Sequence, residues 1–273
     1  MKLAFSKIKP YLYPENPIDQ RFFSRIKKGL INYAQVRSNW VIPTFQTWIK
    51  QQKFSFLWKD ENWSCKVIVS GSDVTHLWVA NEIFIDQVYD LSVVPFAPDV
   101  IVDLGSNIGL FTILATKQWS ESMLICVEPH PKTFSFLCAN LEANKIEATK
   151  LQCAVSSHSE IKFLKNEGAV FQELSDNGDL DNRVLTVSLN SLINNFLDIK
   201  LLIKMDIEGA EYEVLQNTNL NFPKECFFFI ELHKGDWSLA WINEWSSENG
   251  FDFFEVRRRD EAIDGYLKRK VDT

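Results

Sequence analysis

The sequence predicts an α/β fold with a doubly wound, mostly parallel sheet and a mixed α+β region ahead of it. Two observations support this prediction. From residue 98 onward, short apolar runs alternate with segments of helical periodicity, which is typical of a parallel sheet covered by helices on both faces. In addition, the apolar run 100–104 passes through a glycine turn directly into a helical segment, as the first βα unit of a nucleotide-binding sheet does.

The regular part of the chain, residues 91–273, is predicted to be one domain whose elements alternate along the sequence. Between residues 156 and 183 the pattern is less regular, with hairpin signals at Glu167-Gly168 and Asn177-Gly178. The predicted strands are 100–104, 123–128, 149–155, 184–189, 200–206, 226–232, 251–256 and 265–270. The predicted helices are 108–119, 130–144, 190–198, 209–217 and 236–249.

Residues 1–90 lack this regular alternation of strand-like and helix-like segments. They are predicted to form a separate, mixed cap that helps to cover a substrate. Aromatic and apolar residues there occur in short segments that proline and polar residues interrupt. The predicted elements are a helix over 19–38, short strands over 54–60, 63–71 and 75–80, and a short helix over 80–91.

Length, composition and net charge favour an ordinary globular protein and argue against a general nucleic-acid binder. The chain has 273 residues, of which 46% are hydrophobic and 24% charged, enough for one large α/β domain or one domain with an appendage. A formal net charge of −7 argues against a general nucleic-acid binder. The basic residues Arg257, Arg258 and Arg259, with 268–270, are expected on a solvated surface, and contact with a phosphate or an acidic substrate is the alternative.

Cysteine usage and the lack of long apolar runs bear on location. No two cysteines have CxxC or zinc-type spacing, so buried, reduced thiols are expected, which favours the cytoplasm. The N-terminus has no signal-peptide pattern, and no apolar run approaches the roughly 18 residues of a membrane span. The five cysteines are Cys65, Cys126, Cys138, Cys153 and Cys226.

The turn after the first regular strand predicts a site for a nucleotide-like ligand. Gly105 and Gly109 allow the backbone to approach a ligand closely. Asn107 stands where a dinucleotide fingerprint has its middle glycine, so a pyrophosphate cradle is disfavoured. Glu128 ends the second strand, 19 residues after Gly109, where an acid can accept hydrogen bonds from a ribose diol. The alternatives are that Asp103 caps the helix and that Glu128 is a surface carboxylate.

Acidic side chains and one histidine follow two later strands, over 200–206 and 226–232. Side chains alternate along a strand, so Lys204 and Asp206 share one face, and Glu231 and His233 share one as well. If the two strands are neighbours, these groups and Glu208 converge beside the glycine turn. Glu211, in the first turn of the following helix, is expected to be a cap or a partner of the helix dipole.

Four blocks together resemble the FkbM family of S-adenosylmethionine-dependent methyltransferases, across roughly residues 80 to 235. The blocks are VIVDLGSNIGLFTI (100–113), VEPHP (127–131), LLIKMDIEGAEYEVL (201–215) and FFFIELH (227–233). The resemblance implies the class I methyltransferase fold, a Rossmann-like seven-stranded sheet whose last strand is antiparallel. It also implies S-adenosylmethionine as the cofactor, residues 91–273 as its domain, and methylation of a hydroxyl on a small molecule or a sugar.

Carried over by position, the resemblance assigns the cofactor-binding residues. It puts the methionine end of the cofactor at the glycine turn, the ribose at Glu128 and the adenine near Ala154 and Val155. The residues of the turn are Asp103, Gly105, Ser106, Asn107 and Gly109. One departure is Asn190, which stands where family members tend to have a carboxylate, so a role of that acid in substrate binding is in doubt here.

Removing or weakening the proton of an acceptor hydroxyl is the task expected of the acidic cluster, because a neutral alcohol is a poor nucleophile. His233 is a candidate general base that titrates near neutral pH, and Asp206 or Glu208 is a candidate to hold the hydroxyl or take its proton. Lys204 could stabilise an alkoxide or pair with an acid, and Glu231 completes the set. A metal site formed by these carboxylates and the histidine is the less favoured reading, and no metal is expected.

Several other functions stay open at this level. The acceptor could be a nitrogen instead of an oxygen, or the protein could be an NAD-dependent oxidoreductase or a non-catalytic nucleotide-binding module. The partner expected is a small-molecule or glycan acceptor, with no nucleic acid and no membrane span. Oligomeric state is unreadable from the sequence, and a homodimer is possible.

Overall fold

The computed structural model describes most of the chain from residue 53 onward. The residues that it describes are 53–59, 63–70, 75–164, 174–176, 183–216, 220–233, 239–260 and 262–270. The predicted helix over 19–38 and the two hairpin signals lie outside these ranges. The described residues divide into two compact units, and the larger one comprises 56–68 and the described residues from 88 onward. The predicted boundary near residue 90 stays a prediction.

The larger unit is built on a seven-stranded sheet with the order β12-β13-β11-β10-β3-β4-β5. Neighbouring strands from β11 to β5 are parallel, and β13 is antiparallel to both of its neighbours. The predicted mostly parallel sheet with an antiparallel last strand is therefore confirmed. The strands are β3 (Val100–Leu104), β4 (Met123–Val127), β5 (Thr149–Leu151), β10 (Lys200–Met205), β11 (Glu225–His233), β12 (Phe251–Arg258) and β13 (Ala262–Arg269).

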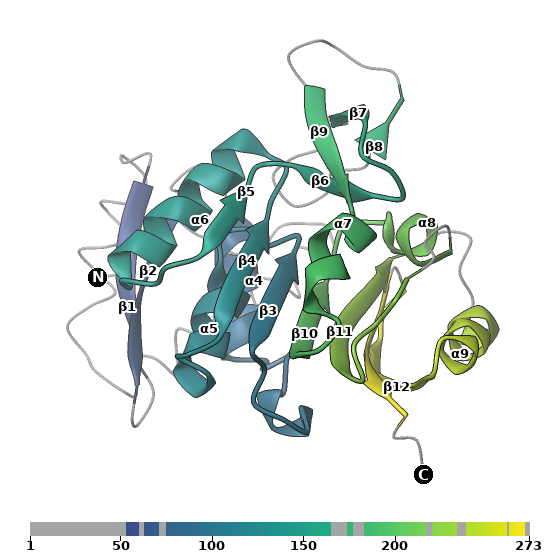
Figure 1. The fold of residues 1–273 in the computed structure, drawn as a ribbon. Coiled ribbons are helices and arrows are strands. Elements are labelled where there is room, and N and C mark those ends of the chain that lie inside the picture. The colour runs from purple at the N-terminus through teal and green to yellow at the C-terminus, as the bar shows by residue number, and fades with distance from the viewer. Residues whose placement is uncertain are drawn as a thin grey trace. The chain divides into compact units, whose positions relative to one another are not determined.

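Helices flank this sheet (Figure 1). Two successive residues of β11 show that both faces are covered: Phe228 packs on Phe222 and Phe251, whereas Phe229, on the opposite face, packs on Phe111 and Tyr89. Every residue of β3 is buried, as expected for a central parallel strand. The helices are α5 (Leu110–Gln118), α6 (Pro131–Ala143), α7 (Leu189–Ile193), α8 (Glu211–Gln216) and α9 (Leu239–Glu248), with the short 3-10 turns η1 (Leu91–Val93) and η3 (Asn194–Phe196).

The order of the strands fixes where a ligand binds. After β3 the chain moves outward through β4 to β5, and it later returns to place β10 on the other side of β3. The junction of β3 and β10 is thus the switch point of the sheet, where open α/β sheets bind ligands beyond the carboxyl ends of their strands. Both the glycine turn and the acidic cluster start at this edge.

A smaller sheet lies beyond the carboxyl ends of β3 and β4 (Figure 1). It has four strands in the order β6-β9-β7-β8, and β6 and β9 are parallel. The predicted single strand 149–155 is wrong for this reason: its first part pairs with β4 as β5, and its second part leaves to pair with β9. The four strands are β6 (Ala154–Ser156), β7 (Ile161–Leu164), β8 (Leu174–Ser175) and β9 (Arg183–Ser188).

Near the described N-terminal end, β1 (Lys53–Lys59) and β2 (Ser64–Ser70) match the two strands predicted there, and the structure pairs them in a two-stranded sheet. The predicted strand over 75–80 is wrong, because this segment begins α4 (Thr75–Phe84). The buried positions His76, Ala80, Ile83 and Phe84 follow the three-to-four spacing of a helix and not the alternation of a strand.

All five cysteines lie in the described part of the chain and none of them forms a disulfide bond, as expected from the absence of CxxC spacing. Of these, Cys65, Cys126 and Cys226 are buried. Across the described residues, no helix combines the length and the apolar character needed to cross a membrane.

Two asparagines, Asn140 in α6 and Asn144 at its C-cap, take the place of a neighbouring strand for β2. The amide of Asn140 accepts from Ile68 N (2.6 Å) and donates to Ile68 O (3.0 Å) and to Ile108 O (2.8 Å). One helical turn later, Asn144 pairs in the same way with the N–H and the C=O of Lys66. These side chains therefore satisfy backbone groups of β2 and of the glycine turn together.

Asn140→Ala is expected to lower the free energy of unfolding by about 2–4 kcal/mol, because it leaves one buried backbone group, Ile108 O, and two partly buried ones of Ile68 without partners. Asn144→Ala is the matched control, since its contacts are exposed and water can replace them. Chemical denaturation of both variants measures the difference. Equal losses in the two variants would contradict this role of Asn140.

Candidate active site

The glycines of the turn after β3 are required by the protein's own packing. Gly105, Asn107 and Gly109 have left-handed backbone, with φ of 69°, 50° and 85°. A Cβ on Gly105 would lie 1.8 Å from the carbonyl oxygen of Asp206, and one on Gly109 would lie 2.7 Å from Leu137 Cδ1. The first glycine thus lets the turns after β3 and β10 touch, and the second lets α5 begin against α6.

Glu128 is buried at the end of β4 and is oriented by backbone. Its two carboxylate oxygens accept from Asn107 N and His130 N, both at 2.9 Å. Burial raises the pKa of Glu128 to about 7, and these two N–H groups partly offset that rise. The glycine turn is further tied to β4 because Ser106 N donates to Val127 O. The reading of Glu128 as a surface carboxylate is therefore wrong.

Asp103 is buried in the middle of the sheet, beneath the turn. Its Oδ2 accepts from Thr112 Oγ1 at 2.6 Å, while Oδ1 lies 3.6 Å from Lys204 Nζ and has no hydrogen-bond partner among the described residues. Burial raises the pKa of the Asp103 carboxyl, although Lys204 opposes the rise. Gly109 and not Asp103 is the N-cap of α5, so the capping alternative is wrong.

A hollow opens where these elements meet. Four of the predicted cofactor residues border it, namely Gly105, Asn107, Glu128 and Ala154. Asp103, Ser106 and Gly109 belong to the same turn and do not border it. Two acids of the acidic cluster, Asp206 and Glu208, border it as well. The remaining lining is mostly apolar: Val127, Pro129, Cys153, Val155, Leu164, Leu174 and Ile207.

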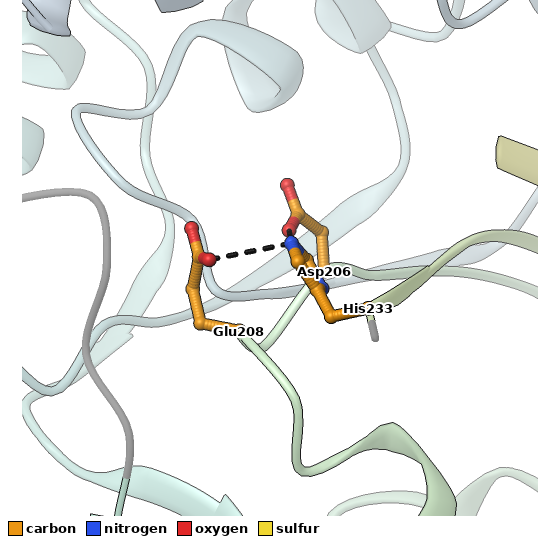
Figure 2. Close-up of side chains that lie close together, drawn as sticks. All are labelled: Asp206, Glu208 and His233. Atoms are coloured by element: carbon orange, nitrogen blue, oxygen red, sulfur yellow. Dashed lines mark ion pairs between the residues drawn. The ribbon is translucent and has the colours of Figure 1, made fainter. Parts of the chain in front are cut away.

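The acidic cluster, formed by Asp206, Glu208, Glu231 and His233, comes together because β10 and β11 are parallel neighbours, with Lys204 opposite Phe229. Figure 2 shows the side chains of Asp206, Glu208 and His233 turned toward one another. His233 Nε2 lies 3.3 Å from Glu208 Oε2, 3.3 Å from Glu231 Oε1 and 3.9 Å from Asp206 Oδ1. The predicted convergence of these groups beside the glycine turn is present in the structure.

Lys204 connects the glycine turn with the acidic cluster. Its ammonium donates to Gly105 O at 2.6 Å and to Leu104 O at 3.3 Å, and it pairs with Asp206 at 3.4 Å. The side chain is buried and does not border the hollow. Of the two roles that the sequence leaves open for Lys204, this geometry corresponds to pairing with acids.

The charges around His233 set its protonation. Burial alone would lower its pKa, but hydrogen bonds to Glu211 and Glu231 and the nearby Asp206 raise it to about 12. His233 is therefore an imidazolium at neutral pH. This pKa is far above the near-neutral value expected from the sequence, because His233 lies among carboxylates that favour its charged form.

Two carboxyls at the hollow have opposite shifts. Burial and the adjacent Asp206 raise the pKa of Glu208 to about 9. Burial also opposes ionisation of Asp206, but the positive charges of Lys204 and His233 outweigh it and hold its pKa below the usual value. At neutral pH the side of the hollow formed by the turn after β10 thus presents one ionised carboxylate, Asp206, and one protonated carboxyl, Glu208.

Two residues of the cluster are missing from the sequence-based set. Glu211 accepts from His233 Nδ1 at 3.0 Å, which its place in a helix first turn does not reveal. Arg259 pairs with Glu231 and with Asp264, so the expectation of a solvated basic surface is wrong for this arginine. No sequence signal identifies the Arg259 contact, because it depends on the turn between β12 and β13 reaching back to β11.

Asp206, Glu208 and His233 could also hold a cation, since one ligand atom from each lies within 4.8 Å of the others. A histidine must be neutral to bind a metal ion, whereas the carboxylates around His233 hold it protonated. The cluster therefore accommodates either a proton or a cation at this position, and the absence of a metal requirement stays a prediction.

Comparison with known proteins relates this site to a family. The family of the methyltransferase FkbM domain matches residues 103–258. Methyltransferase 1 of Beauveria bassiana is 29% identical over 169 residues, or 51% of this chain. The 31-O-demethyl-FK506 methyltransferase FkbM of Streptomyces tacrolimicus is 31% identical over 100 residues, or 34% of the chain. The hexuronic acid methyltransferase AglP of Haloferax volcanii is 28% identical over 141 residues, or 50% of the chain.

The alignments span 66%, 38% and 57% of the lengths of these three relatives, respectively. The matched family range starts at Asp103 and contains Glu128, Glu208 and His233, so it includes both sides of the hollow. It also covers more than half of the chain of 273 residues. The chain therefore belongs to the FkbM family of S-adenosylmethionine-dependent methyltransferases.

Proposed function

We propose that this protein transfers a methyl group from S-adenosylmethionine to a hydroxyl of a small molecule or a sugar. The observation that carries the proposal is that one hollow is bordered by Glu128 and the glycine turn on one side and by Asp206 and Glu208 on the other. If Glu128 and the glycine turn hold the methyl donor, an acceptor next to that donor lies beside Asp206 and Glu208. Such positioning is the main requirement of an in-line displacement.

The residues of the hollow suit S-adenosylmethionine, which supplies a methyl group on a positively charged sulfur. Glu128 can accept hydrogen bonds from ribose hydroxyls, because each of its oxygens has one partner in the protein and a further lone pair. Ala154, Val155 and Leu164 offer an apolar wall for a base. Asp103 lies beneath the turn predicted to hold the methionine end, and its Oδ1 has no hydrogen-bond donor among the described residues, but it faces Lys204 and does not border the hollow.

Asp206 and Glu208 have different roles toward the acceptor. Asp206 is held ionised and is suited to accept a hydrogen bond that orients the hydroxyl. Glu208 is the more basic carboxyl, and once ionised it takes the proton as the carbon–oxygen bond forms. The imidazolium of His233 stays protonated and offsets the negative charge of both. This assignment moves the role of general base from His233 to Glu208.

Names of two relatives support an oxygen acceptor. One name refers to 31-O-demethyl-FK506 and the other to hexuronic acid. A nitrogen acceptor of the same fold is the second candidate, because a carboxylate pair can also orient an amine. The NAD-dependent oxidoreductase is no longer a candidate, since the chain belongs to a methyltransferase family.

S-adenosylhomocysteine, the demethylated cofactor, is expected to bind the wild-type chain, and Glu128→Ala is expected to weaken it by about 10- to 100-fold, equivalent to ~1.4–2.7 kcal/mol. Loss of a charged acceptor for the ribose is the reason. Isothermal titration calorimetry measures both, with Glu121→Gln as the matched control because Glu121 is exposed. Tight NAD binding with no binding of the demethylated cofactor would contradict the proposal.

The acceptor is tested with S-adenosylmethionine that carries a labelled methyl group. Hydroxylated small molecules and sugars are compared with matched amines, and NMR of the product identifies the atom that bears the label. The proposal expects an ether product. Labelled nitrogen products alone would establish the second candidate instead.

A further inference from the structure

Glu211 is the most enclosed acid of the cluster, and none of the roles above uses it. It is the first residue of α8, its side chain is 1% exposed, and it does not border the hollow. A buried carboxylate needs partners that compensate its charge. The partners of Glu211 are the backbone of the turn after β10 and the imidazole of His233.

The first set of contacts holds the turn that carries Glu208. Glu211 Oε1 accepts from Ile207 N at 2.9 Å, and both oxygens accept from Gly209 N at 3.2 and 3.1 Å. These two N–H groups flank Glu208, whose φ of 57° is left-handed, a conformation that a residue with a side chain rarely adopts. The carboxylate of Glu211 thus supports an unfavourable backbone conformation that directs Glu208 to the hollow.

The second contact orients His233. Glu211 Oε1 lies 3.0 Å from Nδ1, so the opposite nitrogen, Nε2, faces the other acids. The hydrogen bond made by one ring nitrogen sets the orientation and the role of the other. The titratable groups that face the imidazole are Glu211 from α8, Asp206 and Glu208 from the turn after β10, and Glu231 from β11, which is itself paired with Arg259.

We propose that Glu211 is the positioning residue of this site: a single buried carboxylate sets both the orientation of the His233 ring and the conformation of the turn that presents Glu208. Glu211 acts through these two residues and does not contact the acceptor. The expected effect on methyl transfer rests on the proposed function, whereas the expected effect on His233 is a property of the chain by itself.

The test compares Glu211→Ala and Glu211→Gln with Glu213→Gln in the full chain. Glu213 lies on the same helix and binds Ser156, Ser157 and Lys162, away from His233. The readouts are the side-chain nitrogen NMR signals of His233, assigned with His233→Gln, the affinity for S-adenosylhomocysteine, and the rate of methyl transfer.

We expect both Glu211 variants to shift the Nδ1 signal of His233, and Glu213→Gln to leave it in place. We expect kcat to fall about 100-fold in Glu211→Ala, which is the scale of a small misplacement of catalytic groups, while the affinity for S-adenosylhomocysteine stays within about threefold because Glu211 does not border the hollow. Glu211→Gln keeps an acceptor oxygen for the turn, so it should recover part of the rate but not the wild-type signal.

An unchanged His233 signal in Glu211→Gln, or an equal shift in Glu213→Gln, would overturn the proposal. If Glu211→Ala does not fold, Glu211→Gln decides. If the wild-type chain transfers no methyl group to any acceptor, the proposed function fails, and the NMR comparison still decides the role of Glu211.

Discussion

Glu208→Gln is expected to lower kcat for methyl transfer by about 10²–10⁴-fold, the usual contribution of a general base. Glutamine keeps the size of the side chain and its place at the hollow, but it cannot accept the acceptor's proton. Affinity for S-adenosylhomocysteine should stay within a few fold, because Glu128 and the glycine turn are unchanged. Steady-state kinetics and calorimetry on the same preparation separate the two effects.

Glu225→Gln is the matched control, since Glu225 lies at the opposite end of β11 and pairs with Lys200 near the surface. It should leave kcat unchanged. Addition of EDTA to the wild-type enzyme should also leave the rate unchanged, because no metal requirement is predicted. A Glu208→Gln variant with wild-type kcat would show that another group accepts the proton.

The pH dependence follows from the raised pKa of Glu208, about 9. A base acts only when it is deprotonated, so below that pKa the active fraction increases with pH, approaching tenfold per unit. The value of kcat/KM, which reports the free enzyme, should therefore rise from pH 7 toward pH 9 and then level off. A positively charged ligand in the hollow lowers the pKa of a nearby carboxyl, so the profile of kcat should rise at lower pH. Both rises should disappear in Glu208→Gln.

Gly105→Ala is expected to lower the free energy of unfolding by more than about 4 kcal/mol, at the level of the most disruptive single substitutions. The new Cβ would meet the carbonyl oxygen of Asp206 at 1.8 Å, and φ at this position is 69°. Neither backbone can retreat, because Asp206 N donates to Leu104 O and Lys204 binds Gly105 O. At ~2–4 °C per kcal/mol, the melting temperature should fall by more than ~8 °C.

Gly209→Ala separates the clash from backbone strain. Gly209 has φ of 103° and nothing within 4 Å of an added Cβ, so only the strained conformation costs energy, about 1–3 kcal/mol. Differential scanning calorimetry of both variants makes the comparison. Equal destabilisation of the two would mean that the close approach of the turns after β3 and β10 is not what requires Gly105.

Local pattern was sufficient for most of the sheet. Buried apolar runs such as 100–104 and 200–206 predict their strands because a parallel strand covered on both faces must be apolar throughout. Pattern failed where a strand changes partners, as at 149–155, since an extended segment looks the same in either sheet. It also failed at 75–80, where a few apolar residues fit either the alternation of a strand or the spacing of a helix.

The contacts of the site also fall into those that the sequence pattern predicts and those that it does not. Alternation along two neighbouring strands was enough to bring Asp206, Glu231 and His233 together. The contact of Arg259 with Glu231 was not predictable, because it joins residues 28 positions apart through the path of a turn. The protonation of His233 was not predictable either, since it depends on how many carboxylates surround the ring and on how little water reaches it.

The sequence by itself determined the α/β class, the ligand-binding edge of the sheet, the family and the acids that border the hollow, Glu128, Asp206 and Glu208, because these follow from periodicity, glycine placement and the order of short motifs. Only the tertiary structure decided the roles within the hollow: that Gly105 serves the contact between two turns, that Glu211 supports His233 and Glu208, and that the imidazole is charged. The reason is physical. Secondary structure depends on neighbours along the chain, whereas steric clearance and pKa depend on neighbours in space, which the fold alone brings together.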